Sequence, residues 1–182
     1  MKSMCCRCLL TIAVAVSIAF ALALSTPAMA DLITLKVPGI PGDLKVNGEE
    51  GVIEVMSLSN SVQNTSVVGS GSGGAGTSKL VPSDMVINKR LDASSPPLFL
   101  AMVTGKHFPN AVITFLQENE KGNLTKFFTF TLSNVVVSKL ETNASENQVL
   151  TEKINLNYSR IQLKDEASGQ QACWDIPSNT SC

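Results

Sequence analysis

The sequence has few of the residues from which active sites are usually built. His107 is the only histidine among 182 residues, and Tyr158 and Trp174 are the only tyrosine and tryptophan. No Gly-x-Ser-x-Gly or His-Glu-x-x-His segment is present, so neither a nucleophilic hydrolase nor a zinc protease is indicated. Two amphipathic aromatic side chains are also too few for a sugar-stacking platform. We therefore interpret His107 as a turn or interface residue.

The acidic side chains form no evident catalytic pair. A glycosidase needs two carboxylates that face the same bond. Here the acids fall in predicted loops or at strand ends, where charges are ordinarily solvated: Glu49, Glu50, Glu118, Glu120, Glu141, Glu146, Asp165 and Glu166. We predict that the protein is not an enzyme and has no catalytic, cofactor-binding or metal-binding residues.

Clustered positive charge is missing as well. The 14 basic and 15 acidic residues give a formal net charge of −1, and no basic block or arginine stripe stands out. Proteins that bind nucleic acid concentrate Lys and Arg on one surface. Nucleic acid is therefore not an expected partner.

The N-terminus is typical of a secretory signal peptide. Lys2 and Arg7 precede the uncharged apolar run 9–24, and Ala28-Met29-Ala30 offers the small-x-small pattern of a cleavage site. We predict cleavage after Ala30, with the alternative of an uncleaved anchor helix. The remaining 152 residues are enough for one domain, predicted at 31–182 and located in the periplasm or outside the cell. No stable membrane insertion is expected after cleavage.

Cysteine usage changes when this leader is removed. Three of the five cysteines lie within the first eight residues, which leaves Cys173 and Cys182 near the C-terminus. In an oxidising compartment they could form a disulfide, and closing so short a loop would stabilise the fold by about 2–3 kcal/mol. The alternative is one buried cysteine and one on a frayed end.

Beyond the leader, the pattern is mainly β. Short runs of alternating apolar residues are separated by Gly, Pro, Asn and Asp, which is typical of antiparallel strands. The apolar phase shifts between Tyr158 and Ile161, so we expect a bend or bulge near Ser159-Arg160 that lets the sheet curl into a barrel. The predicted strands are 32–37, 51–64, 80–89, 111–117, 124–138, 149–164 and 172–176.

One short helix is predicted at about 95–104. Ser95 can cap its first turn, Pro96 suits a first helical position, and Gly105 can adopt the left-handed conformation that ends a helix. Because its residues are mostly apolar, the helix should lie against the sheet.

A glycine-rich loop is predicted at 67–78. It lacks the Gly-Lys-Ser or Gly-Lys-Thr step of a phosphate-binding loop and has no side chains for a core, so it should project from the domain. Its central residues are Gly69, Ser70, Gly71, Ser72, Gly73, Gly74, Ala75 and Gly76.

These segments together resemble the haemolysin-coregulated protein (Hcp) family, the tube subunits of bacterial type VI secretion systems. The most specific part is 95–101 followed by Gly105-Lys106-His107-Phe108-Pro109, which is similar to the family's helix and its Gly-Lys-His-Tyr-Pro element. Further matches are 38–42 after the first strand, 51–55, 150–158 and the closing segment Cys173-Trp174-Asp175-Ile176.

The resemblance implies a compact β-barrel of two packed antiparallel sheets with one flanking helix. It also implies six-membered rings that stack into hollow tubes, with Gly69 to Gly76 contacting the neighbouring ring and strand edges joining subunits within a ring. The implied partners are other copies of the chain, a spike protein, a contractile sheath and small effectors.

Two features differ from the family pattern. The family assembles in the cytoplasm without a general export signal, and it usually has an aromatic residue where this chain has 56–60, Met-Ser-Leu-Ser-Asn. We therefore expect either a tube subunit or a secreted relative of one. The alternative is an exported monomeric β-rich binding module.

Overall fold

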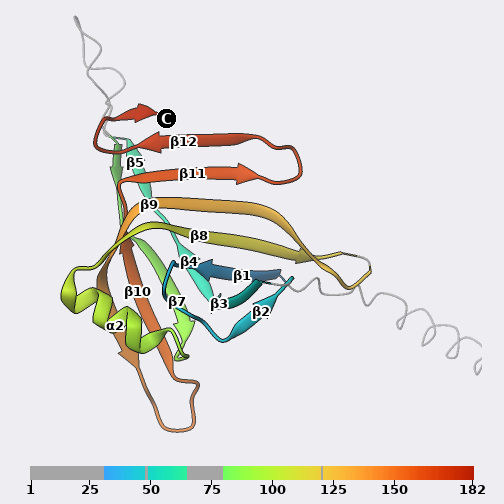
Figure 1. The fold of residues 1–182 in the computed structure, drawn as a ribbon, viewed down its shortest axis with the longest axis vertical. Helices are drawn as coiled ribbons and strands as arrows, with labels where there is room; N and C mark the ends of the chain where they lie inside the picture. Colours follow the sequence, from blue (N-terminus) through green and yellow to red (C-terminus); the bar gives the residue numbers. More distant parts are fainter. Residues whose placement is uncertain (1–30, 48, 65–79, 120) are drawn as a thin grey trace, which may run out of the picture.

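The computed structural model describes residues 31–182 except 48, 65–79 and 120 (Figure 1). The predicted signal peptide, 1–30, and the whole of the predicted glycine-rich loop, 67–78, lie outside these residues. Among the described strands, those of the main sheet and their neighbours are β1 Asp31–Lys36, β2 Leu44–Val46, β3 Glu49–Val55, β4 Ser57–Ser59, β7 Met85–Arg90, β8 His107–Glu118, β9 Leu124–Asn143, β10 Thr151–Asn157, β11 Arg160–Asp165, β12 Gln171–Asp175 and β13 Thr180–Ser181. Strands β5 Val62–Asn64 and β6 Leu80–Pro82 form a separate ribbon.

The strands close into an antiparallel barrel. Strand β1 pairs with β8 and β3, while β8 pairs with β9 and β9 with β10. Strand β10 pairs with β7, which pairs with β4. Closure follows because β4 continues β3 around a corner at Met56, whose backbone N–H donates to the carbonyl of Asn88 at 2.8 Å. The mainly β fold with one helix, predicted from the sequence, is confirmed.

Beyond the barrel, the sheet extends into three more strands, β11, β12 and β13, which we call the wing (Figure 1). The 20-residue strand β9 makes this possible. Its first part pairs with β11 and its second part with β10, so the two partners lie along the same edge of β9.

The predicted bend separates these two partners. Strand β10 ends at Asn157 and β11 begins at Arg160, and Ser159 donates its backbone N–H to the carbonyl of Ser133 at 3.1 Å. The phase change in the sequence therefore marks the point where the chain leaves the barrel and enters the wing. The single strand predicted over 149–164 is two strands.

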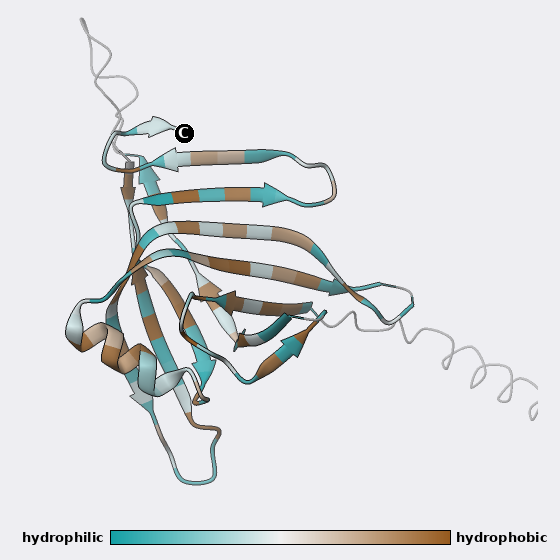
Figure 2. Cartoon of the chain, in the orientation of Figure 1, coloured by the Kyte–Doolittle hydropathy of each residue, from teal (hydrophilic) through white to brown (hydrophobic). Residues whose placement is uncertain are grey.

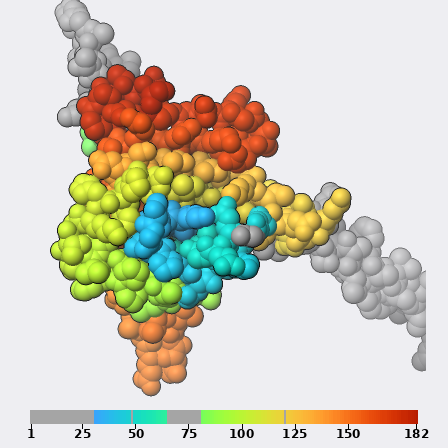
Figure 3. Space-filling view, in the orientation of Figure 1, coloured from blue at the N-terminus to red at the C-terminus, as the bar shows by residue number. Residues whose placement is uncertain are grey.

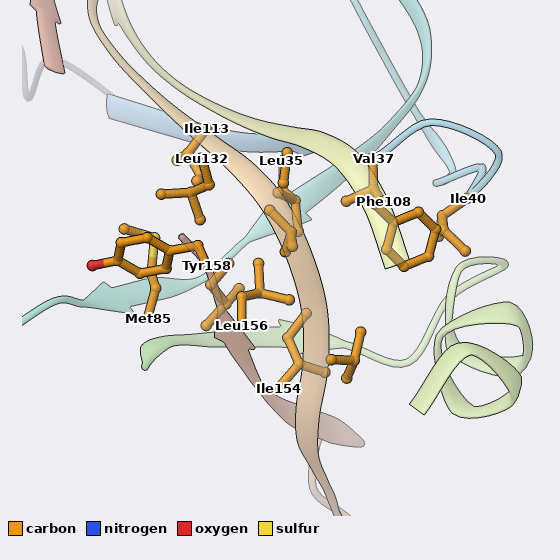
Figure 4. Close-up of a cluster of buried hydrophobic side chains, with 14 of the residues drawn as sticks. Leu35, Val37, Ile40, Met85, Phe108, Ile113, Leu132, Ile154, Leu156 and Tyr158 are labelled. Atoms are coloured by element: carbon orange, nitrogen blue, oxygen red, sulfur yellow. The ribbon is translucent and has the colours of Figure 1, made fainter. Parts of the chain in front are cut away.

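Alternating side chains from the barrel strands fill one core, as the banding in Figure 2 illustrates. The centre of that core is drawn in Figure 4, where side chains from opposite walls meet. The buried members include Leu35, Ile53, Met85, Ile87, Leu98, Phe108, Ile113, Leu132, Ile154, Leu156 and Tyr158.

Several other strand boundaries differ from the sequence prediction. The run 51–64 is divided into β3, β4 and β5, and 80–89 is divided into β6 and β7. Strand β8 begins at His107 rather than Ala111, although Pro109 cannot donate a ladder hydrogen bond. Asn134, on the partner strand β9, has a left-handed backbone with φ of 53°, and the local distortion of β9 accommodates the proline.

Helix α2, Ser95–Thr104, confirms the predicted helix. Gly105 ends it with φ of 61°, and its N–H donates to the carbonyl of Met102 at 3.2 Å. The predicted cap was wrong, because the N-cap is Ser94 and no side-chain cap hydrogen bond forms. The Ser95 hydroxyl is instead engaged with buried charged groups of β7 and β10.

Candidate assembly surface

A buried lysine fixes α2 to the barrel. Lys89 follows Met85 and Ile87 along the inward side of β7, and its side chain is fully buried. Its Nζ lies 3.1 Å from Glu152 Oε2 on β10 and 2.8 Å from Asp92 Oδ1. An unpaired ammonium at such a position would cost several kcal/mol, so these acceptors are what allow it to be buried.

The first residue of α2 completes this network. Lys89 Nζ donates to Ser95 Oγ at 3.0 Å, and Ser95 Oγ donates to Glu152 Oε2 at 2.9 Å. The start of the helix is thereby tied to two barrel strands at once. Buried hydrogen-bonded networks of this kind fix one geometry rather than many. The helix therefore presents its outer face from a rigid base.

That outer face is apolar, although it is exposed in the single chain. Leu98 and Ala101 face the core, while Phe99, Leu100 and Val103 are 53%, 60% and 56% exposed. The ten residues of α2 include no charged side chain. A helix that is apolar all round is normally buried on all sides. We call Phe99, Leu100 and Val103 the helix patch.

A second exposed apolar group lies where β7 leaves the barrel. Leu91 donates its backbone N–H to the carbonyl of Leu150 at 3.2 Å, and the side chains of Leu91, Val149 and Leu150 are all exposed. Val149 and Leu150 lie at the end of the β9–β10 hairpin, which protrudes below the barrel in Figure 3. The same molecule therefore carries apolar side chains on two exposed elements.

A cluster of phenylalanines lies where the barrel opens toward the wing. The ring of Phe115 on β8 is 5.2 Å from that of Phe130 and 6.1 Å from that of Phe127, and Phe128 is 5.5 Å from Phe130. Tilted and edge-on contacts at these distances are favourable. Phe115, Phe128 and Phe130 are only partly buried and Phe127 is exposed, so the cluster is an incompletely covered extension of the core.

The sheet also ends in short edge strands. Its pairing path runs from β13 to β2, which has three residues, and β13 has two. Edge strands carry unpaired backbone groups that can pair with another chain.

Ionisable groups near these surfaces are arranged as structural pairs. Hydrogen bonds from Arg160 and then from Ser178 lower the pKa of Asp175 to about 2. Hydrogen bonds from Lys126 and Lys36 lower the pKa of Glu49. Burial, and secondarily the charge of Asp84, raises the pKa of the Tyr158 phenol. Each shift has an ordinary structural cause and requires no catalytic role.

The lone histidine is not part of a reactive group. His107 is exposed at the start of β8, and its Nδ1 lies 3.1 Å from the side-chain oxygen of Asn134. In the part of the chain that the structure describes, no three His, Cys, Asp or Glu side chains converge as metal ligands. Within the same residues, no helix is long and apolar enough to cross a bilayer.

The residues predicted as sites from the sequence fall into two groups. The stacking loop Gly69 to Gly76 lies outside the described residues. Cys173 and Cys182 lie together, and the structure joins them through a disulfide with a Cα–Cα distance of 5.3 Å.

The Lys89 network was missed at the sequence level. A signal existed, because Lys89 continues the alternating inward phase of Met85 and Ile87. Its partner Glu152, however, is 63 positions away, and only the pairing of β7 with β10 brings the two together.

Comparison with known proteins gives a consistent result. Residues 34–164 match the sequence model of a family described as "Type VI secretion system effector, Hcp". Protein hcp1 of Pseudomonas aeruginosa is 33% identical over 81 residues, which is 44% of this chain and 49% of that protein. The aligned part thus spans about half the length of this relative.

Solved structures show the same fold. Hcp1 from Salmonella typhimurium has a TM-score of 0.69 at 23% identity, covering 85% of this chain and 100% of that one. An Hcp1 protein from E. coli EAEC 042, with two tryptophan substitutions, has a TM-score of 0.68 at 23% identity and covers 82% and 99%.

Proposed function

The chain belongs to the Hcp family of structural, non-enzymatic type VI secretion proteins, and we propose that it forms six-membered rings that stack into a hollow tube. Family membership rests on the match over 34–164, which runs from within β1 through α2 to the last strand of the barrel and all but the final residue of β11. Ring formation, stacking and effector carriage are the proposal.

The helix patch is the observation that carries this proposal. Its three side chains project from a charge-free helix that buried charged groups hold in place. Apolar surface of this kind marks a contact with another macromolecule, and burying it stabilises a complex by about 25 cal/mol per Å². A neighbouring copy of the same chain would cover it without requiring any charged partner.

The partly covered phenylalanine cluster supports the same proposal. It lies on β8 and β9 rather than on α2, and its members Phe115 and Phe130 pack against the barrel core. A ring subunit needs two different contact surfaces, one for each neighbour, because a head-to-tail interface joins unlike faces. The helix patch and the cluster are proposed as these two surfaces.

Stacking between rings is assigned to Gly69 to Gly76. These residues offer no side chains for a core, so deleting them should leave the barrel intact and weaken contacts between rings. Deletion followed by electron microscopy tests the assignment. Tubes as long as those of the unaltered protein would contradict it.

The predicted leader bears on where assembly occurs. If the leader is cleaved after Ala30, the proposed rings would form outside the cytoplasm. The protein would then be a specialised relative of the tube subunit, and its rings would carry small effectors. Without export through the general pathway, a spike protein and a contractile sheath are the proposed partners. Measuring secretion into the medium after deletion of the contractile apparatus separates the two routes. Secretion through the general pathway would continue, whereas secretion through the apparatus would stop.

Size-exclusion chromatography with light scattering on the exported protein tests the function directly. A mass of six chains, or a multiple of six, at micromolar concentration supports the ring. A stable monomer contradicts it and favours the monomeric binding module.

A further inference from the structure

The last strand of the chain is held by few backbone contacts and one covalent bond. Strand β13 pairs with β12 at only two positions, Trp174 with Ser181 and Asp175 with Thr180. A single further backbone contact joins the N–H of Cys182 to the carbonyl of Cys173 at 3.4 Å. So short a terminal strand is marginal by itself, because chain ends fray unless they are held. Ser178, in the turn before β13, donates to Asp175 Oδ1 and lies 2.9 Å from Thr180 Oγ1, and the disulfide between Cys173 and Cys182 is the one covalent restraint on the end of the strand.

Strand β12 is attached far more firmly than β13. It pairs with β11 at five positions, from Arg160 with Asp175 to Lys164 with Gln171. The Arg160 guanidinium also donates to Asp175 Oδ2 at 2.8 Å, and Ile176 donates its N–H to the carbonyl of Ser159 at 2.9 Å. None of these contacts requires the Sγ–Sγ bond, although Cys173 is itself one of the five paired residues. Breaking that bond should therefore release β13 while leaving β12 in the sheet.

Release of β13 would uncover a β-strand edge. In the disulfide-bonded chain, β13 and Cys182 lie along Cys173, Trp174 and Asp175 of β12. Without them β12 becomes the outermost strand of the wing, with the backbone groups of Gln171, Cys173 and Asp175 available for pairing, because those of the alternate residues bond to β11. Uncovered edges of this kind accept strands from other chains.

We propose that the redox state of the Cys173–Cys182 disulfide controls whether β13 covers the edge of β12. While the disulfide is intact, β13 prevents a second copy of the chain from adding a strand to β12. When it is reduced, β13 leaves and the edge accepts that second copy. This inference rests on the proposed self-assembly. It adds that the redox state of the compartment determines whether copies can also pair through β12.

The chemical step is an ordinary disulfide reduction. A dithiol reductant supplies two electrons and two protons, and it becomes a cyclic disulfide itself. The Sγ–Sγ bond breaks, and Cys173 and Cys182 each become a thiol. An oxidising compartment keeps the disulfide intact and β13 in place, whereas a reducing compartment breaks the disulfide and releases β13.

The test compares the exported protein before and after reduction with a dithiol, alongside a Cys173→Ser, Cys182→Ser variant. Hydrogen exchange reports on the strand, and light scattering reports on the mass. Amides of Thr180 and Cys182, which face β12 in the alternating ladder, should exchange at least about tenfold faster in the reduced and serine forms, with those of β9 unchanged. Both forms should also show additional, concentration-dependent higher-mass species.

A matched control isolates the edge itself. Ala172 is exposed on β12, and a charged residue at an edge discourages strand addition. Adding Ala172→Lys to the serine variant should leave the fast exchange of β13 unchanged and abolish the additional species. Persistence of those species would show that they do not form through β12, which would overturn the proposal.

The remaining outcomes distinguish this proposal from the function on which it rests. Rings of equal mass in both redox states overturn the redox control of the β12 edge alone, as does unchanged exchange at Thr180 and Cys182. A monomer in both redox states contradicts both the ring function and the redox control of the β12 edge.

Discussion

Lys89 Nζ lies 3.1 Å from Glu152 Oε2, and the two side chains are 0% and 3% exposed. The pair joins β7 to β10 directly beneath the start of α2, because Ser95 Oγ bonds to both groups. The exposed face of the helix is thus positioned by charges buried on the opposite side. This relationship connects the stability of the barrel to the surface proposed for assembly.

Lys89→Met should destabilise the fold strongly. Removing one partner leaves Glu152 buried without its counter-ion, which typically costs about 3–5 kcal/mol. Urea unfolding of the purified protein measures the change. Lys36→Met is the matched control, because Lys36 and Glu49 form an exposed pair at 3.0 Å and such pairs contribute about 0–1 kcal/mol. Equal losses in the two variants would contradict the structural role of the network.

Leu100→Glu should impair assembly without unfolding the chain. The side chain is the most exposed of the helix patch and contacts little in the monomer, so the cost to monomer stability should stay within about 0.5 kcal/mol. A charge there would be buried in a complex and oppose it. Val62→Glu, at an exposed site on β5, is the control and should leave the mass unchanged. A Leu100→Glu protein that still forms complexes of the original mass would exclude the helix patch.

Gly105→Ala should cost about 1 kcal/mol, because φ of 61° disfavours any side chain. A Cβ at this position meets nothing within 4 Å, so the loss would come from the backbone alone. Gly105→Asn should cost less, since asparagine tolerates the left-handed region. Thermal unfolding of both variants checks the order, and an equal loss in the two would argue against a backbone origin.

Acid should weaken the attachment of β12. The folded-state pKa of Asp175 is about 2, below its ordinary value of 3.8, so its contribution is fully present above pH 4. It is lost as the pH falls from about 4 toward 2, because the unfolded chain binds the proton first. Arg160→Gln should raise the pKa of Asp175 toward its ordinary value, as NMR titration of the carboxyl would measure. An unchanged pKa would mean that the ion pair with Arg160 does not set it.

The features predicted from the sequence were those with local causes. The bounds of α2 follow from Pro96 and Gly105, and the bend at Ser159 follows from a phase change within a few residues. A local pattern carries such information because turns and helix ends depend on neighbouring residues.

The features that were missed depend on distant pairing. Strand pairing between distant segments divides β9 between β10 and β11. Such pairing also forms the corner at Met56 that closes the barrel. The role of Ser95 was misjudged for the same reason, since its hydroxyl bonds to Glu152, 57 positions away. The helix patch could be anticipated from composition, but its exposure required the fold.

Electron micrographs of residues 31–182 in the disulfide-bonded form, at micromolar concentration, test the central claim most directly. The account predicts rings with six-fold symmetry and, at higher concentration, hollow tubes built from them. A field of single, unassembled molecules under the same conditions would contradict it.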